Sequence, residues 1–263
     1  MKSLSHFKNS SFNKIKFLLT DIDDTLTDEG QLGPEAYQSL WDLHKAGIHV
    51  IPVTGRPAGW CEMIARLWPV SGVVGENGGF YFRYHEKQMK RKFFFSESIQ
   101  AKNRHQLDLI LKEIQNKIPQ SGIASDQFCR LMDLAIDFCE DVPALPESEV
   151  LKIVDIFKAH GAQAKISSIH VNGWFGDYNK VSMSLDFLKT EFNLSPEEAK
   201  KICAFSGDSP NDEPMFDFFP NSFAVANFAD FAHKVEKKPS YISSQKGGLG
   251  FCEIAQIILE TSK

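Results

Sequence analysis

The sequence predicts an α/β fold, a parallel sheet with helices, interrupted by a smaller α+β unit. Two observations carry this prediction. Short apolar runs of strand length alternate with segments of helix length near both ends of the 263-residue chain, and this rhythm changes between residues 83 and 171. Alternating strands and helices favour parallel pairing with right-handed crossovers. We therefore expect one core from residues 1–82 and 172–263, with residues 83–171 inserted as a second domain.

The first part of the chain contains three expected strands and two expected helices. The strands are short apolar or β-branched runs that end in polar or glycine-rich turns, at residues 16–23, 48–55 and 71–79. Pro34 suits the first turn of a helix and Gly47 suits its end, so a helix is predicted between them. Pro57 is predicted to begin a second helix, which runs to Trp68.

The same alternation returns near the C-terminus. Helices are predicted at residues 178–192 and 209–219, and strands at 201–208 and 221–227. The inserted stretch is predicted to contain helices at 103–118 and 146–161, and strands at 129–139 and 164–171. Its mixture of helices and alternating strands is typical of a small α+β unit.

Composition excludes several classes of protein. A net charge of −5 gives no general attraction to nucleic acid or to anionic membranes, so neither is an expected partner. No apolar run approaches the about 20 residues that span a bilayer, and the N-terminus lacks the apolar region of a signal peptide. The five cysteines show no close metal-binding or redox spacing and are expected to be free thiols. These features predict a cytoplasmic protein.

Carboxylates gather where the first strand ends, in the stretch FLLTDIDDTLTDEG. Asp21 and Asp23 follow its apolar residues directly. Ligands of parallel α/β sheets bind at the carboxyl ends of strands, and other polar residues are expected at the same edge: Thr54, Glu76, Asn77, Asp208, Asn211 and Asp212. Several converging acids need a cation, and oxygen ligands of this kind suit Mg²⁺. The set Asp21, Asp23, Asp208, Asn211 and Asp212 is therefore the candidate metal site.

Two simpler explanations of the acidic stretch were weighed. A calcium-binding loop requires glycine at its sixth position and glutamate at its twelfth, where Leu26 and Leu32 stand. A strand also precedes the stretch in place of a helix, so a calcium loop is rejected. A solvated acidic turn would not explain why Asp208 and Asp212 follow a second strand end in the same way.

The motifs together resemble the haloacid dehalogenase superfamily. DIDDT after an apolar strand, VTGR at the second strand end, Lys180 on a later helix and GDSPND occur in the order of the four motifs of that family. The insert resembles the type-2 (IIB, Cof-like) cap of its sugar-phosphatase branch, and ENGG also matches that branch. GDSPNDEPM is similar to mannosyl-3-phosphoglycerate phosphatases. Asp24 departs from the pattern, because many relatives carry glycine there. The resemblance implies a Rossmann-like core with an inserted cap domain.

The resemblance also implies catalytic roles. Asp21 would be the nucleophile that forms an aspartyl-phosphate, and Asp23 would act as general acid and base. Thr54 and Lys180 would hold phosphate oxygens. Mg²⁺ would be bound by the carboxylates of Asp21 and Asp208 and the backbone carbonyl of Asp23, with Asn211 and Asp212 orienting the metal, its waters or Lys180. Arg56 is left open between a phosphate contact and a surface residue at a helix start.

The cap is expected to select the substrate. Polar or aromatic candidates for contact with it are Asn77 beside the core, and Arg130, His170, Asn172 and Trp174 in the insert. A histidine or an indole can stack on a sugar, and arginine can pair with an anionic group. The alternative for His170 is a core or edge residue of a strand, and the alternative for Trp174 is packing at the hinge.

The predicted function is a Mg²⁺-dependent phosphomonoesterase acting on a phosphorylated sugar or a related small metabolite. A phosphomutase of the same fold, similar to phosphomannomutases, is the alternative enzyme, and a non-catalytic binding protein is the alternative outside enzymes. The substrates left open are mannosyl-phosphoglycerate, sucrose phosphate, trehalose phosphate, phosphoglycolate and simple hexose phosphates. The oligomeric state is also left open.

Overall fold

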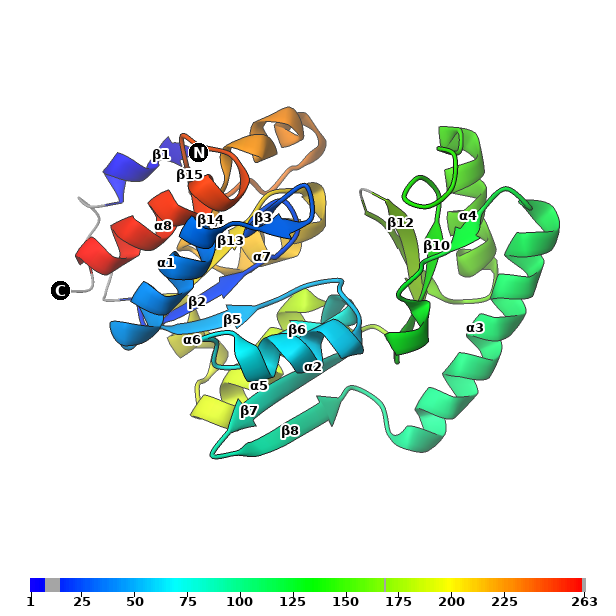
Figure 1. The fold of residues 1–263 in the computed structure, drawn as a ribbon, viewed down its shortest axis with the longest axis horizontal. Coiled ribbons are helices and arrows are strands. Elements are labelled where there is room, and N and C mark those ends of the chain that lie inside the picture. The colour runs from blue at the N-terminus through cyan, green and yellow to red at the C-terminus, as the bar shows by residue number, and fades with distance from the viewer. Residues whose placement is uncertain (8–14, 168, 262–263) are drawn as a thin grey trace.

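The computed structural model of the protein describes residues 1–7, 15–167 and 169–261. Figure 1 shows two parts. A larger part, called the core below, holds a sheet between two layers of helices. A smaller part, called the cap, holds its own sheet and two helices, and the strands of that sheet lie on the side nearer the core.

The core sheet has six parallel strands in the order β1-β15-β14-β13-β2-β5. Their bounds are β1 Lys2–Ser3, β2 Phe17–Thr20, β5 His49–Pro52, β13 Cys203–Gly207, β14 Ser222–Ala224 and β15 Tyr241–Ile242. The strand β6 Val73–Gly75 adjoins β5 through a parallel bridge between Val53 and Val74. The predicted parallel α/β core is confirmed.

Beyond β6 the pairing becomes antiparallel. β6 pairs with β7 Phe80–His85, which pairs in turn with β8 Gln88–Phe93. A smaller hairpin, β3 Thr27–Asp28 with β4 Gln31–Leu32, follows the acidic stretch. Phe80 and Phe82 of β7 are buried in the core, so this edge extends the apolar packing of the sheet.

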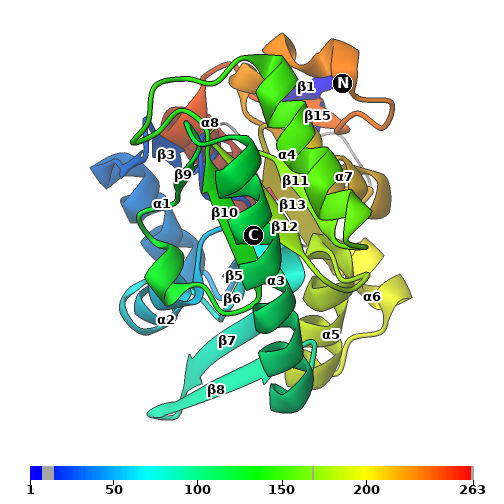
Figure 2. The same ribbon diagram turned by 90° about the vertical axis from the view of Figure 1, so that its right-hand side faces the viewer.

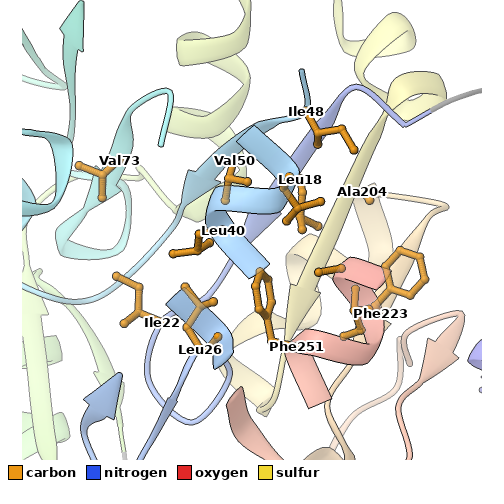
Figure 3. Packing of buried hydrophobic residues seen from close by; sticks show 14 of the residues in the cluster. Leu18, Ile22, Leu26, Leu40, Ile48, Val50, Val73, Ala204, Phe223 and Phe251 are labelled. Carbon is orange, nitrogen blue, oxygen red and sulfur yellow. The ribbon is translucent and has the colours of Figure 1, made fainter. Parts of the chain in front are cut away.

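Alternate residues of the strands pack on opposite faces of the core sheet. Leu18 and Val50 pack on one face, as Figure 3 shows, while Leu19 and Ile51 pack on the other. Burial on both faces is the reason that these strands appear in the sequence as continuous apolar runs.

Helices cover both faces of the core sheet. The first face carries α1 Pro34–Lys45, α2 Ala58–Leu67 and α8 Gly247–Thr261. The second carries α5 Lys180–Phe192, α6 Pro196–Ile202 and α7 Glu213–Phe218. Pro57 is the N-cap of α2, so the helix begins at Ala58, one residue later than predicted. Within the described ranges, no helix is both long and apolar enough to cross a membrane.

The cap is an antiparallel sheet backed by two helices. The strand order is β11-β12-β10-β9, with β9 Gly122–Ile123, β10 Asp133–Asp137, β11 Gln163–Ile166 and β12 His170–Trp174. The helices α3 Glu97–Lys117 and α4 Glu147–Ala159 lie on the side away from the core (Figures 1 and 2). Leu134, Ile136 and Val171 pack among these helices in an apolar cluster separate from those of the core.

Short 3₁₀ helices occupy several connections: η1 Leu4–His6, η2 Glu76–Gly78, η3 Gln127–Cys129, η4 Pro210–Asp212, η5 Ala226–Asp230 and η6 Ala232–Lys234. Arg130 follows η3 and does not open a strand, because β10 begins only at Asp133. The predicted strand 129–139 is therefore shorter than expected.

The predicted single strand over residues 164–171 is wrong. The chain reverses there, and β11 pairs with β12 as a hairpin in which Ile166 lies opposite Val171. The Ser167 hydroxyl accepts a hydrogen bond from the His170 backbone N–H at 3.0 Å and donates one to the His170 carbonyl at 3.0 Å. A serine side chain can replace backbone partners in this way at a turn.

Candidate active site

The carboxyl ends of β2 and β13 bring two acidic segments together. The strands are parallel neighbours, with Thr20 opposite Ser206. The backbone N–H of Asp21 donates to the Ser206 carbonyl at 2.9 Å, which extends the ladder by one residue. Asp21 and Asp208 therefore leave the same edge of the sheet side by side, although they are far apart in sequence.

Three buried carboxylates converge at this edge. One carboxylate oxygen from each of Asp21, Asp208 and Asp212 lies within 4.8 Å of the others. Asp212 accepts a hydrogen bond from the backbone N–H of Asp208 at 3.2 Å, and the Thr25 hydroxyl donates to Asp208 at 3.1 Å. These bonds hold the side chains in a fixed arrangement rather than in a solvated turn.

Lys180 is the cation of this cluster. Its ammonium lies 3.1 Å from Asp21 and 2.8 Å from Asp212. Lys180 is the first residue of α5, whose start is held by reciprocal hydrogen bonds between Asn179 and Ser182. Gly78 allows η2 to pass close to this start, because a Cβ at position 78 would collide with the Asn179 carbonyl. The helix terminus and the turn together place the buried ammonium.

Burial and charge shift the pKa values of these groups. Burial, with the carboxylates of Asp212 and Asp23, raises the pKa of Asp21 to about 7, although Lys180 opposes the change. Burial and the neighbouring Asp212 and Asp21 raise the pKa of Asp208 well above its ordinary value. Burial alone would lower the pKa of Lys180, but Asp21 and Asp212 raise it. Lys180 therefore stays charged and only partly balances the carboxylates.

The cluster fits a hard divalent cation. Three buried carboxylates with one lysine leave excess negative charge, and all the converging donors are oxygens, as Mg²⁺ prefers. Of the five residues in the predicted metal set, Asp21, Asp208 and Asp212 converge directly. The side-chain oxygen of Asn211 instead accepts from Lys180 at 3.3 Å. The carboxylate of Asp23 is held by Arg56.

Arg56 forms a paired contact with Asp23. Its Nε lies 3.0 and 3.1 Å from the two carboxylate oxygens of Asp23, and its Nη2 lies 2.7 Å from one of them. The guanidinium also lies over the ring of Trp60, 4.5 Å from its centre. The backbone N–H of Arg56 donates to the hydroxyl of the buried Thr54 at 3.0 Å. Arg56 is therefore part of the acidic edge and not simply a surface residue at a helix start.

The turn η2 joins the core to the cap. Asn77 has a left-handed backbone, with φ of 55°, and its N–H donates to the Thr54 carbonyl. The fully buried carboxylate of Glu76 accepts hydrogen bonds from Ala58 N–H of the core and from three successive N–H groups of the cap, at Leu131, Met132 and Asp133. The ENGG motif marked this position in the sequence, but the partners across the two domains are not visible there.

Two of the predicted cap residues, Arg130 and Asn172, lie in a buried polar network. Arg130 is bound by Asp126 at 2.8 Å, by Asp133 at 3.2 Å and by the Gly55 carbonyl at 3.1 Å. Asn172 donates to Asp133 at 3.0 Å. With these contacts, Arg130 already has carboxylate partners from its own chain and braces the cap against the core.

The remaining two predicted cap residues have separate environments. The ring Nε2 of His170 lies 2.9 Å from a carboxylate oxygen of Glu140, which is half-exposed. Trp174 is buried and stacks on Tyr178 with ring centres 5.8 Å apart. His170 therefore has a polar partner at the start of the inner strand β12, whereas Trp174 packs where the cap chain returns to the core.

One residue near the acidic cluster was not among the predicted site residues. Lys165 lies on β11 of the cap, and its ammonium donates to the carbonyl of Asn211 in the core at 3.0 Å. Burial and the charge of Lys180 lower its pKa, while Asp212 and Asp21 oppose this change. The only sign of Lys165 in the sequence was its position between the apolar Ala164 and Ile166. Because a single strand was wrongly predicted over residues 164–171, the sequence did not indicate which face of the cap sheet carries this side chain.

Comparisons with known proteins agree with the fold and the motifs. Residues 18–124 match the family model of haloacid dehalogenase-like hydrolases. The fold is similar to the crystal structure of protein 0175 of Thermoplasma acidophilum, with a TM-score of 0.74 and 22% identity over 94% of this chain and 99% of the other. The comparison with curated protein sequences gave no match.

Two further solved structures share the fold at low identity. A HAD/COF-like hydrolase of Plasmodium vivax has a TM-score of 0.70 and 16% identity, over 97% of this chain and 99% of its own. The sucrose-phosphatase of Synechocystis sp. PCC6803 has a TM-score of 0.63 and 15% identity, over 94% and 98%. The family model thus matches residues 18–124, and the solved structures share the fold over most of the chain.

Proposed function

We propose that the protein is a Mg²⁺-dependent phosphomonoesterase that acts on a phosphorylated sugar or a related small metabolite. The observation that carries the proposal is the convergence of Asp21, Asp208 and Asp212 around Lys180 at the end of the sheet. Similar folds include the sucrose-phosphatase solved with sucrose and phosphate, and a trehalose-6-phosphate phosphatase related protein. These similarities support the choice of substrate class.

In the proposed mechanism, Asp21 is the nucleophile. A carboxylate oxygen of Asp21 attacks phosphorus, the bond from phosphorus to the ester oxygen breaks, and the ester oxygen leaves with its electron pair and takes a proton from Asp23. Asp23 then removes a proton from water, and the water oxygen attacks phosphorus while the bond to Asp21 breaks. The products are an alcohol and phosphate, and both carboxyl groups return to their starting state.

Neighbouring side chains prepare these steps. Lys180 holds Asp21 at 3.1 Å and is close enough to the nucleophile to bind non-bridging phosphate oxygens. The Thr54 hydroxyl, two residues beyond the end of the neighbouring strand β5, is proposed for the same task. Arg56 orients the carboxylate of Asp23 through paired contacts. Because this pairing favours the ionised carboxylate, the pair must loosen before Asp23 can act as the acid. Mg²⁺ held by the carboxylates of Asp21 and Asp208 and the Asp23 carbonyl would reduce repulsion between the nucleophile and the phosphate.

The proposal also covers the division of the chain into domains and the cellular location of the enzyme. Residues 1–82 and 172–263 are proposed as the catalytic domain, with residues 83–171 as the substrate-selecting cap. β8, which ends at Phe93, nevertheless pairs with β7 of the core, and β12, which ends at Trp174, pairs with β10 of the cap. Within the cap and its border, Asn77, His170 and Asn172 are the proposed substrate contacts. The enzyme would act in the cytoplasm on a small molecule, with mannosyl-phosphoglycerate among the candidates because of the GDSPNDEPM segment.

Phosphate release tests this proposal directly. The purified protein is assayed with p-nitrophenyl phosphate and a panel of sugar phosphates, phosphoglycolate and mannosyl-phosphoglycerate, in Mg²⁺ or in EDTA. We expect release that requires Mg²⁺, and a preferred panel member would identify the substrate class. Transfer of phosphate between positions of one sugar, dependent on a sugar bisphosphate, would instead indicate a phosphomutase. Absence of both activities in folded protein with Mg²⁺ would contradict an enzyme of either kind.

A further inference from the structure

The hairpin of β11 and β12 directs Lys165 toward the core. Lys165 lies opposite Asn172 in the register of the two strands, so both side chains are on the same face of the cap sheet. Leu134, Ile136 and Val171 occupy the opposite face, which packs against the cap helices. Alternation along each strand therefore places Lys165 on the polar face that lies nearer the core in Figures 1 and 2.

The contact of Lys165 places its ammonium at the acidic cluster. The carbonyl that it binds at 3.0 Å belongs to Asn211, and the amide oxygen of the same residue accepts from Lys180 at 3.3 Å. Two lysines, one from the cap and one from the core, thus share Asn211. The backbone of Asn211 lies in η4, directly beside Asp212.

Lys165 differs from the other cations near the acidic cluster in its charged partners. Among the described residues, Lys165 has no carboxylate within salt-bridge distance, and its one hydrogen-bond acceptor is the Asn211 carbonyl. Lys180 pairs with Asp21 and Asp212, and Arg56 pairs with Asp23. A partly buried ammonium with donors to spare and no counter-ion of its own is suited to an anionic ligand.

Resting on the proposed function, we infer that Lys165 binds the phosphoryl group of the substrate, as a second ammonium that the cap supplies beside Lys180. A divalent cation and Lys180 together balance the three carboxylates, so an incoming phosphate dianion requires further positive charge. Lys165 provides it only while β11 lies against η4. Phosphate affinity therefore depends on the position of the cap, whatever the leaving group is.

Substitution of Lys165 tests this inference. Lys165→Met removes the charge, Lys165→Arg keeps it, and Lys152→Met is the matched control, because Lys152 is exposed on α4 and pairs with Glu149 of the same helix. Binding of inorganic phosphate is measured by titration calorimetry with Mg²⁺ present, and kcat/KM is measured for p-nitrophenyl phosphate and for the best sugar phosphate. Circular dichroism and thermal unfolding verify that the variants are folded.

We expect Lys165→Met to weaken phosphate binding and to lower kcat/KM for both substrates by about 10- to 100-fold, as loss of a hydrogen bond to a charged group does. Lys165→Arg should recover part of the loss, and Lys152→Met should behave as the wild type. A loss confined to the sugar phosphate, with phosphate binding unchanged, would overturn the inference and place Lys165 on the leaving group. Unchanged behaviour in every assay would also overturn it.

The phosphate titration separates this inference from the proposed function. If the wild type releases no phosphate from any substrate, the proposed function fails. Wild-type phosphate binding that Lys165→Met alone weakens would then still support the phosphoryl-binding role of Lys165. If the wild type hydrolyses the panel and Lys165→Met binds phosphate equally well, only the inference on Lys165 fails.

Discussion

Burial and crowding make ionisation of the carboxylates at the acidic edge less favourable than it is in water. Asp21 is buried beside two other acids, and its pKa is raised to about 7 in the absence of a metal ion. One lysine cannot neutralise three carboxylates, so repulsion among them opposes folding. A divalent cation bound there, as proposed, would remove that repulsion, so metal binding would stabilise the fold as well as serve the chemistry.

Asp208→Asn separates the repulsion among the carboxylates from the stabilisation by a bound cation. In EDTA the variant should have a higher melting temperature than the wild type, because it removes one of three crowded charges. In Mg²⁺ the wild type should gain several degrees, since a ligand at about 100 times its Kd adds about 2.7 kcal/mol. The variant should gain much less. Differential scanning calorimetry with and without Mg²⁺ makes the measurement.

The control for this prediction is Asp217→Asn, at an exposed position on α7 paired loosely with Lys237 at 3.4 Å. It should keep the full Mg²⁺-dependent gain. An equal gain in Asp208→Asn and in the wild type would show that Asp208 does not bind the ion.

At the scale of elements, η2 connects the two domains through a single side chain. The Glu76 carboxylate caps the start of α2 and receives the N–H groups that lead into β10. Burial and the Asp133 carboxylate raise the pKa of Glu76 to about 7, against the lowering effect of the N–H groups of Leu131 and Met132. At a pH above this value, Glu76 is an acceptor at both oxygens and suits all of its donors.

Glu76→Gln should destabilise the protein at such a pH. The amide nitrogen of glutamine is a donor and cannot accept a hydrogen bond. The backbone N–H groups that face it would lose their acceptor, and we expect this to lower the free energy of unfolding by about 1–3 kcal/mol. Urea unfolding gives the free energy of unfolding. Glu86→Gln, on the exposed turn between β7 and β8, is the control and should match the wild type. Equal unfolding free energies for both variants would contradict the connecting role of Glu76.

At the scale of the whole molecule, much of the core followed from the sequence because its signals are local. Buried parallel strands require continuous apolar runs, and their polar ends must then meet at one edge, so the convergence of Asp21 with Asp208 could be predicted. The cap was less predictable. The reversal at Ser167 is held by its backbone N–H and its hydroxyl, which both bond to His170, and without that reversal Lys165 is assigned to the opposite face from His170.

Partners that lie across domains also escaped prediction from the sequence. Arg130 was expected to meet a substrate anion, but its guanidinium is bound by Asp126, Asp133 and a core carbonyl. Glu76 was recognised only as part of a motif. The Gly55 carbonyl and the cap N–H groups that bind Glu76 become partners only when the cap and core come together, which no single chain segment predicts, whereas Asp126 and Asp133 lie close to Arg130 in its own segment.

Covalent phosphorylation of Asp21 is the central claim, and Asp23→Asn tests it most directly. This variant can still be phosphorylated by p-nitrophenyl phosphate, whose leaving group needs little help from an acid, but it lacks the base that activates water. With Mg²⁺ present, we predict a stoichiometric burst of p-nitrophenolate and, after acid quenching, a phosphoryl group on the peptide that contains Asp21. The absence of a burst in a folded variant that still binds inorganic phosphate, or a phosphoryl group on another residue, would contradict the mechanism.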